Sequence, residues 1–196
     1  MKPSYLRSAS WATIPAAAIV LFSGCTNAVG EAGDDESDEL ASACAPQVPP
    51  ALAVPPGNKL RFDYDAIGVQ IYGCDATATG YGWVFRAPEA NLYGKKGKLA
   101  ATHYAGPTWQ ANDGSTVVGA KLAESPAPDA TAIPWLLLGA TSHAGQGRMT
   151  DVTYIQRLET TGGKAPTTGC DAAHVGDTAR VGYTATYYFY EAHGKK

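Results

Sequence analysis

The chain has 196 residues, which is enough for one domain with a sizeable core, and its apolar fraction of 45% is ordinary for a globular protein. Only 17% of the residues are charged, while the 22 glycines and 13 prolines favour short strands and turns over long helices. From residue 46 onward, 13 lysines and arginines stand against 12 aspartates and glutamates. The resulting net charge of about +1 implies no basic face, so nucleic acid is not an expected partner.

The first segment, residues 1–24, is predicted to be a signal peptide. Lys2 and Arg7 supply the positive charge before an apolar run at residues 11–22, which is shorter than the roughly 20 residues of a membrane-spanning helix. The run ends in small residues followed by Cys25. This order resembles a bacterial lipoprotein signal, in which the cysteine thiol is acylated after cleavage. Cys25 is therefore the expected lipid-attachment site.

An ordinary secretory signal, cleaved after Ala28, is the alternative to lipidation. Both alternatives place the domain outside the cytoplasm. The expected location is that of a membrane-anchored lipoprotein facing the periplasm or the cell surface, or otherwise that of a secreted protein. In the first case the lipid anchor makes the membrane a partner.

Residues 25–45 are predicted to form a disordered acidic linker. Residues 31–39 include six acidic side chains, and almost nothing apolar is present to offset the entropy of ordering. A calcium loop is not expected, because the alternating oxygen ligands and central glycine of such loops are missing. Residues 46–196 then form a single β-rich domain.

The four cysteines are Cys25, Cys44, Cys74 and Cys170. They allow three pairings if all are available, and one stays unpaired if Cys25 carries lipid. Export makes a disulfide the default. We expect Cys74, which ends a strand-like run, to pair with Cys170, which opens a loop, and Cys44 to be unpaired. Such a cross-link contributes roughly 4–5 kcal/mol in the chain-entropy model.

The domain begins with a proline-rich stretch at residues 46–56, which must be extended and is expected to lie on the fold as a lead-in. About nine short strand-like runs follow, with turn signals between them and no helical periodicity. They lie at residues 58–64, 67–74, 81–93 with a break at Ala87-Pro88, 99–104, on either side of a turn at Asp113-Gly114, and at 135–138, 152–160 and 180–190. This pattern predicts an all-β fold, either an antiparallel β-sandwich or a flattened barrel.

The Asp113-Gly114 turn predicts a hairpin. Trp109 pairs with Val118 if the loop has two residues and with Val117 if it has three. In either register the indole packs on a β-branched partner.

Alternation along the strands predicts which side chains share a face. His103 and Tyr104 are neighbours, so they point to opposite faces, whereas residues 135–138 (WLLL) do not alternate and indicate a strand covered on both sides. One face of the strand at 152–160 is expected to hold Val152, Tyr154, Gln156 and Leu158. One face of the last strand is expected to hold Val181, Tyr183, Ala185, Tyr187 and Phe189. Its other face carries Tyr188 and Tyr190, which either fill a sheet face or mark a glycan surface.

No catalytic constellation is present in the sequence. It lacks G-x-S-x-G, P-loop spacing, Gly-x-Gly-x-x-Gly after a strand and Cys/His zinc spacing, and Ser115 is better explained as a turn residue. No two histidines have the spacing of a metal site on one strand or helix. We therefore assign no catalytic residue and expect neither a metal nor a cofactor.

Four residues are candidates for lining a binding pocket, namely His103, Trp109, Trp135 and His174. If the predicted disulfide forms, it brings residues 170–174 back against the strands, where His174 could meet His103.

Nine dispersed runs carry a family resemblance. They are residues 52–60 (LAVPPGNKL), 68–74 (GVQIYGC), 83–90 (WVFRAPEA), 102–109 (THYAGPTW), 113–119 (DGSTVVG), 133–138 (IPWLLL), 152–157 (VTYIQR), 161–171 (TGGKAPTTGCD) and 183–190 (YTATYYFY). Together they closely resemble the "domain of unknown function 3455" family over nearly the whole chain after the linker. The resemblance implies a small exported domain of bacteria or fungi with no established activity, and it assigns no catalytic residue.

Three functional hypotheses follow. The first is a non-enzymatic domain tethered to the cell envelope that binds a small molecule, a glycan or an envelope protein through loops at one end of a β-sandwich. An apolar pocket lined by aromatics, with few convergent ionisable groups, distinguishes it. The second is a secreted hydrolase, with or without the assistance of a metal, that uses His103 and His174 and requires them to meet in a cleft. The third is a purely structural envelope protein without a pocket.

Overall fold

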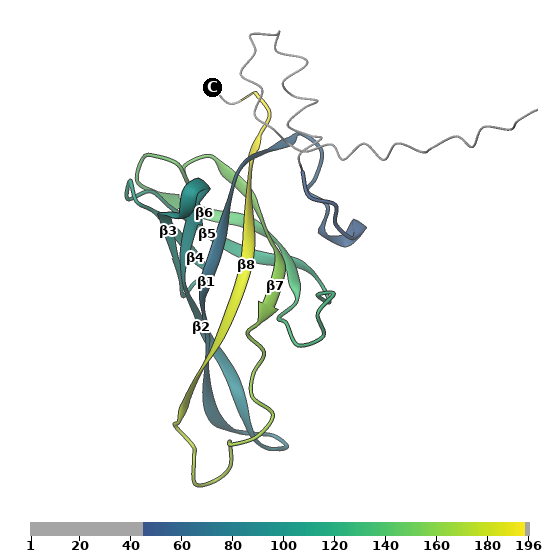
Figure 1. The fold of residues 1–196 in the computed structure, drawn as a ribbon, viewed down its shortest axis with the longest axis vertical. Helices are drawn as coiled ribbons and strands as arrows, with labels where there is room; N and C mark the ends of the chain where they lie inside the picture. Colours follow the sequence, from purple (N-terminus) through teal and green to yellow (C-terminus); the bar gives the residue numbers. More distant parts are fainter. Residues whose placement is uncertain (1–44, 195–196) are drawn as a thin grey trace, which may run out of the picture. The chain divides into compact units, whose positions relative to one another are not determined.

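The computed structural model describes residues 45–194, which form one antiparallel sheet of eight strands closed into a barrel (Figure 1). Each strand pairs with its neighbours in sequence, and the first pairs with the last to complete the ring. The strands are β1 (Asn58–Thr77), β2 (Gly80–Gly94), β3 (Lys98–Tyr104), β4 (Thr108–Ala111), β5 (Thr116–Ser125), β6 (Trp135–Ala144), β7 (Val152–Gly162) and β8 (Thr178–Ala192). Two short 3-10 helices, η1 (Pro50–Leu52) and η2 (Lys95–Gly97), complete the elements.

The all-β prediction is confirmed, and of the two expected architectures the barrel is the one observed. The predicted signal peptide at residues 1–24 and the linker as far as residue 44, with Cys25 and Cys44, lie outside the described residues. Among residues 45–194, no helix combines the length and the apolar character needed to cross a membrane.

The strands are fewer and some are longer than the sequence predicts. β1 is one strand of 20 residues where two short ones were expected, and β2 runs through Ala87-Pro88 without a break. Pro88 fits because β3 pairs with β2 only from Ala90 onward, so on that side the missing amide hydrogen removes no ladder bond. The β1–β2 register also shifts between Ile71 and Tyr72, beside this proline.

The main hydrophobic core lies inside the barrel. Along β8, the alternate residues Tyr183, Ala185, Tyr187 and Phe189 are buried inside, as the period of two predicts. Trp109 of β4 lies edge-on to the rings of Tyr187 and Phe189. The interior is therefore packed by aromatic rings from strands that are distant in sequence.

The β4–β5 hairpin has the longer of the two predicted loops, since Trp109 pairs with Val117. The Asp113 carboxylate accepts hydrogen bonds from the Ser115 amide and hydroxyl at 2.9 and 2.5 Å, and from the Arg148 amide at 2.8 Å. Ser115 is fully buried and its hydroxyl also accepts the Met149 amide. Asp113 and Ser115 thus fasten the β6–β7 loop to this hairpin, which is a structural role.

A second, smaller cluster lies on the outside of the barrel. The proline-rich lead-in packs Leu52, which is fully buried, against Leu137 of β6 and Leu158 of β7. The Gln156 amide donates to the Leu52 carbonyl at 2.7 Å and accepts the Tyr190 hydroxyl at 2.7 Å. Residues 135–138 are therefore covered on both faces, as predicted, and Tyr190 lies buried rather than on an open glycan surface.

The expected shared face of β7 is wrong for Val152. Val152 belongs to the interior core, whereas Tyr154 and Leu158 belong to the outer cluster. The cause is a register shift between Val152 and Tyr154 in the pairing with β8, which adds one residue and reverses the alternation.

We predict that Leu52→Ala lowers the free energy of unfolding by about 2–5 kcal/mol, because it leaves a cavity between the lead-in and the barrel. Urea denaturation measures the loss. Leu122→Ala is the matched control, since Leu122 is 58% exposed and its truncation should change stability by less than about 0.5 kcal/mol. Equal effects of the two substitutions would mean that the lead-in does not stabilise the barrel.

Candidate functional site

A cavity of about 350 Å³ lies within the barrel, and all eight strands contribute to its lining. Its base consists of buried or half-buried side chains, namely Gln70, His103, Trp109, Leu136, Leu138, Arg157 and Tyr187. An eight-stranded barrel is just wide enough either to be filled by its own side chains or to hold one small ligand. Here the aromatic core fills one part of the interior and leaves the cavity in another.

The mouth of the cavity is formed by more exposed residues from β2, the β3–β4 turn and β5. Phe85 and Arg86 come from β2, Gly106 and Pro107 from the turn, and Lys121 from β5. β3 and β4 are the two shortest strands. Because they end at this turn, the wall between β2 and β5 is shortest there, and the cavity opens at that point.

Three N–H donors at the base have no hydrogen-bond partner among the described residues. They are Nε2 of Gln70, Nε1 of Trp109 and Nε of Arg157, and all three atoms are buried. Gln70 is 3% and Trp109 1% exposed, so solvent outside the barrel does not satisfy them. A buried donor without an acceptor costs about 1–3 kcal/mol. The three residues come from β1, β4 and β7, and all of them line the cavity.

His103 is held rigidly beside these donors. Its ring stacks on Trp109 with 4.3 Å between centroids, and Nδ1 lies 2.8 Å from the Thr108 carbonyl. Because a carbonyl only accepts, Nδ1 carries the proton and donates it. Burial is the main cause that lowers the pKa of His103 to about 3. The ring is neutral near pH 7 and too weak a base for general-base catalysis.

Tyr187 completes the base on the β8 side. Its hydroxyl lies 3.3 Å from that of Tyr183, and burial raises the pKa of both phenols. Both groups are therefore neutral at physiological pH and serve as hydrogen-bonding hydroxyls.

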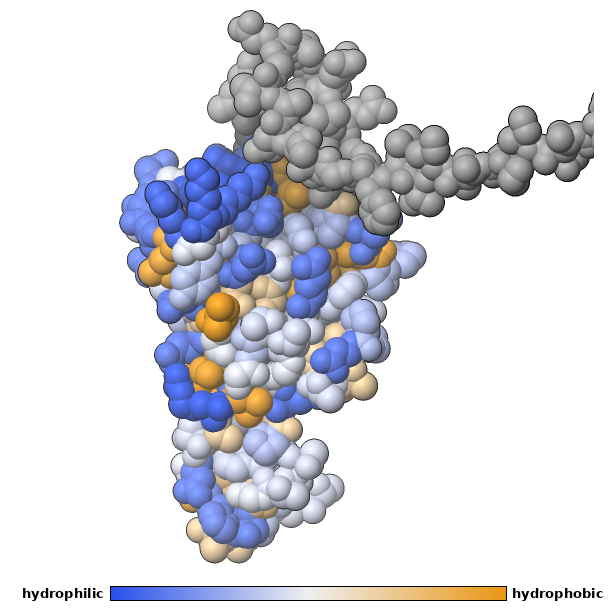
Figure 2. All heavy atoms as spheres, viewed as in Figure 1, coloured by the Kyte–Doolittle hydropathy of each residue, from blue (hydrophilic) through white to orange (hydrophobic). Residues whose placement is uncertain are grey.

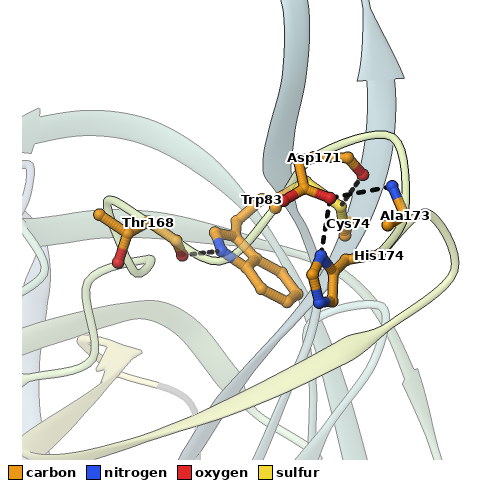
Figure 3. A network of polar contacts seen from close by, with 7 residues as sticks. Cys74, Trp83, Thr168, Asp171, Ala173 and His174 are labelled. Carbon is orange, nitrogen blue, oxygen red and sulfur yellow. Dashed lines mark hydrogen bonds and ion pairs between the residues drawn. A yellow bond between two sulfur atoms is a disulfide. The ribbon is translucent and has the colours of Figure 1, made fainter.

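The structure brings together two of the four predicted pocket residues. His103 and Trp109 line the cavity, whereas Trp135 packs in the outer cluster beneath the lead-in. His174 lies in the β7–β8 loop with its side chain about half exposed and its Nδ1 2.7 Å from the Asp171 carboxylate (Figure 3). His103 and His174 thus have separate partners and do not share the cavity.

The predicted disulfide between Cys74 and Cys170 is confirmed, with 5.4 Å between the Cα atoms. It attaches the β7–β8 loop to the projecting β1–β2 hairpin (Figures 1 and 3). The loop is also held by the Trp83 indole, which donates to the Thr168 carbonyl at 2.9 Å, and by the Gly176 amide, which donates to the Cys74 carbonyl. The cross-link fixes His174 on this arm rather than bringing it to His103.

His174 and Asp171 form an exposed ion pair in this loop. Hydrogen bonding to Asp171 raises the pKa of His174, and the same contact lowers the pKa of Asp171. Among residues 45–194, no group of three or more His, Cys, Asp and Glu side chains is placed to hold a metal ion.

Sequence reasoning missed Gln70 and Arg157. Each stands in alternation with interior residues of its strand, Gln70 with Tyr64 and Ala66 on β1, and Arg157 with Ile155 on β7. A polar residue on the buried face of an alternating strand was the available signal. It could be used only once the inward face of each strand was known.

The fold and the site define a class of protein: a small up-and-down β-barrel with one interior cavity and a disulfide-fastened loop. A family model described as a protein of unknown function (DUF3455) matches residues 55–191, and the chain belongs to that family. No curated protein and no solved structure matches the chain.

We predict that His103 makes the folded state less stable as the pH falls from 6.5 toward 4.5. The pKa of His103 is lowered from 6.5 to about 3 on folding, so in this window the unfolded chain binds a proton that the folded chain does not. Stability therefore falls by up to about 1.4 kcal/mol for each pH unit. Urea denaturation across a pH series measures the slope.

His103→Asn tests this assignment, since the amide can still donate to the Thr108 carbonyl but does not titrate. It should lower stability at pH 8 through loss of the stack on Trp109, and it should also flatten the slope. His174→Asn is the control: the pKa of His174 is raised, so its contribution is present at low pH and lost as the pH rises. That variant should make the acid loss steeper, and a His103→Asn slope as steep as the native one would contradict the prediction.

Proposed function

We propose that this domain is a non-catalytic binding protein that holds one small molecule inside its barrel. The observation that carries the proposal is the cavity of about 350 Å³, whose lining includes three residues with a buried and unpartnered N–H group, Gln70 of β1, Trp109 of β4 and Arg157 of β7. Ligand pockets typically combine apolar walls with a few placed polar groups. Leu136, Leu138 and Trp109 supply such walls here.

The arrangement of the ionisable groups favours binding over catalysis. A hydrolase needs a base or nucleophile poised near the working pH, whereas His103 has a pKa of about 3 and Ser115 is committed to Asp113 and Met149. The hydrolase alternative required His103 and His174 in one cleft, and the two have separate partners.

Binding inside the barrel also fits the surface better than docking of a protein on the visible face. On the face shown in Figure 2, exposed apolar residues form separate spots among polar ones rather than one broad patch. Standard protein interfaces need roughly 800 Å² from each partner, with an apolar centre.

The proposed setting is the cell envelope. The lipoprotein-like segment before Cys25 supports export, and the Cys74–Cys170 disulfide fits an oxidising compartment. A receptor or carrier domain on a tether, which captures a small molecule outside the cytoplasm, is the role that these features support.

Binding is tested with N-phenyl-1-naphthylamine, an uncharged apolar dye that fluoresces when it leaves water. The native protein should bind it saturably with one dye per chain. Leu136→Trp places a bulky indole ring in the cavity and should weaken dye binding at least tenfold. Leu122→Trp makes the same change at an exposed position of β5 and should leave binding unchanged. Absence of saturable binding, or equal binding by both variants, would remove the cavity as the binding site.

Tethering is tested separately by metabolic labelling with radioactive palmitate in a bacterial host that processes lipoproteins. The native chain should be labelled and should fractionate with membranes. The Cys25→Ser variant should not be labelled and should not fractionate with membranes. If the native protein is unlabelled and stays in the soluble fraction, the lipid anchor is ruled out and secretion without an anchor is the correct alternative.

A further inference from the structure

The charges around the cavity are all of one sign. Arg86, Lys121 and Arg157 line it, and no aspartate or glutamate does. Two of the three cations are neutralised at the mouth. The Arg86 guanidinium contacts both carboxylate oxygens of Asp75 at 2.5 Å, and the Lys121 ammonium lies 2.7 Å from the Glu124 carboxylate.

Arg157 differs from both, because no carboxylate pairs with it among residues 45–194. Its Nη2 donates to the Pro134 carbonyl at 2.8 Å, and its Nε has no acceptor. Removing one partner of a buried ion pair is costly, since it leaves a charge uncompensated in a medium of low polarity. Arg157 is half-buried, and no carboxylate among the described residues offsets its charge.

The positive charge reaches the surrounding groups. Burial is the largest influence on the pKa values of His103, Tyr72, Tyr183 and Tyr187, and in each case Arg157 acts in addition to lower the value. The base of the cavity is therefore a region of positive potential in which none of these neighbours carries a compensating negative charge near pH 7.

We infer that the ligand is a small organic carboxylate whose head binds at Arg157 and whose hydrocarbon part lies against Leu136 and Leu138. This inference rests on the proposed function, since it names the class of molecule that the cavity takes. One uncompensated cation matches one monoanion. The planar guanidinium fits the two oxygens of a carboxylate.

A phosphate monoester fits less well. Its charge at neutral pH is between −1.5 and −2, and it presents three strong acceptor oxygens. Arg157 supplies a single free cation, because Arg86 and Lys121 are already paired. The cavity walls beyond the donors are apolar, so they would not solvate the remaining charge.

The test uses the full chain at pH 7.5. It compares small molecules that differ in the polar head group and have a similar hydrocarbon part. Octanoate, octanol and octanamide form one series, and benzoate, benzyl alcohol and phenyl phosphate form another. Each compound competes with N-phenyl-1-naphthylamine, and isothermal titration calorimetry measures its Kd directly. Each carboxylate should bind at least tenfold more tightly than its neutral analogues and than phenyl phosphate.

Arg157→Met should remove this preference while dye binding is retained, because the side chain keeps its apolar stem and loses only the charge. Lys121→Met is the matched control at the mouth and should keep the preference. Arg157→Lys keeps the positive charge but loses the planar guanidinium with its paired N–H donors. This variant should retain part of the preference for carboxylates. The comparison of compounds on the native protein needs no variant, so misfolding of Arg157→Met does not prevent a decision.

The possible results separate the two proposals. If the dye and all compounds fail to bind, the proposed function fails and the inference with it. If the dye binds but carboxylates and alcohols bind equally, the cavity is a binding site and the carboxylate inference is wrong. Tighter binding of phenyl phosphate, or loss of the preference in Lys121→Met as well as in Arg157→Met, overturns the inference too.

Discussion

The pairing of β1 with β8 closes the sheet, and the rest of the structure depends on that closure. It extends from Asn58 opposite Ala192 to Gly73 opposite Thr178, along most of both strands. Closure satisfies the backbone groups that an open sheet would leave at its edges. It also creates an interior in which neither solvent nor backbone satisfies certain side chains. The unpartnered nitrogens of Gln70, Trp109 and Arg157 are a direct consequence.

Burial sets the protonation state of the groups inside the barrel. It holds His103 neutral by making the charged ring costly, and it keeps the phenols of Tyr183 and Tyr187 protonated. Arg157 stays charged under the same conditions, because a guanidinium is not deprotonated in proteins. The base of the cavity thus combines one permanent charge with neutral hydrogen-bonding neighbours.

Local patterns in the sequence predicted those parts of the fold that depend on regular alternation. The inward face of β8, the coverage of residues 135–138 on both sides and the hairpin at Asp113-Gly114 follow from side-chain period and turn chemistry. The predictions failed where the register shifts. A one-residue shift after Val152 reversed the alternation of β7, and Ala87-Pro88 did not end β2 because its neighbour β3 is short.

The sequence by itself determined the fold class and the family, because these depend on local periodicity and on dispersed motifs. It limited the cysteine pairings to three, of which the structure shows Cys74 with Cys170. Only the tertiary structure decided which residues share a cavity. His103 and Trp109 stack across adjacent strands, whereas Gln70 and Arg157 reach the same space from strands far apart in the chain. That convergence is set by barrel closure and by the register of each strand pair. Neither is readable from local sequence, since a shift of one residue exchanges the inside and the outside of the barrel.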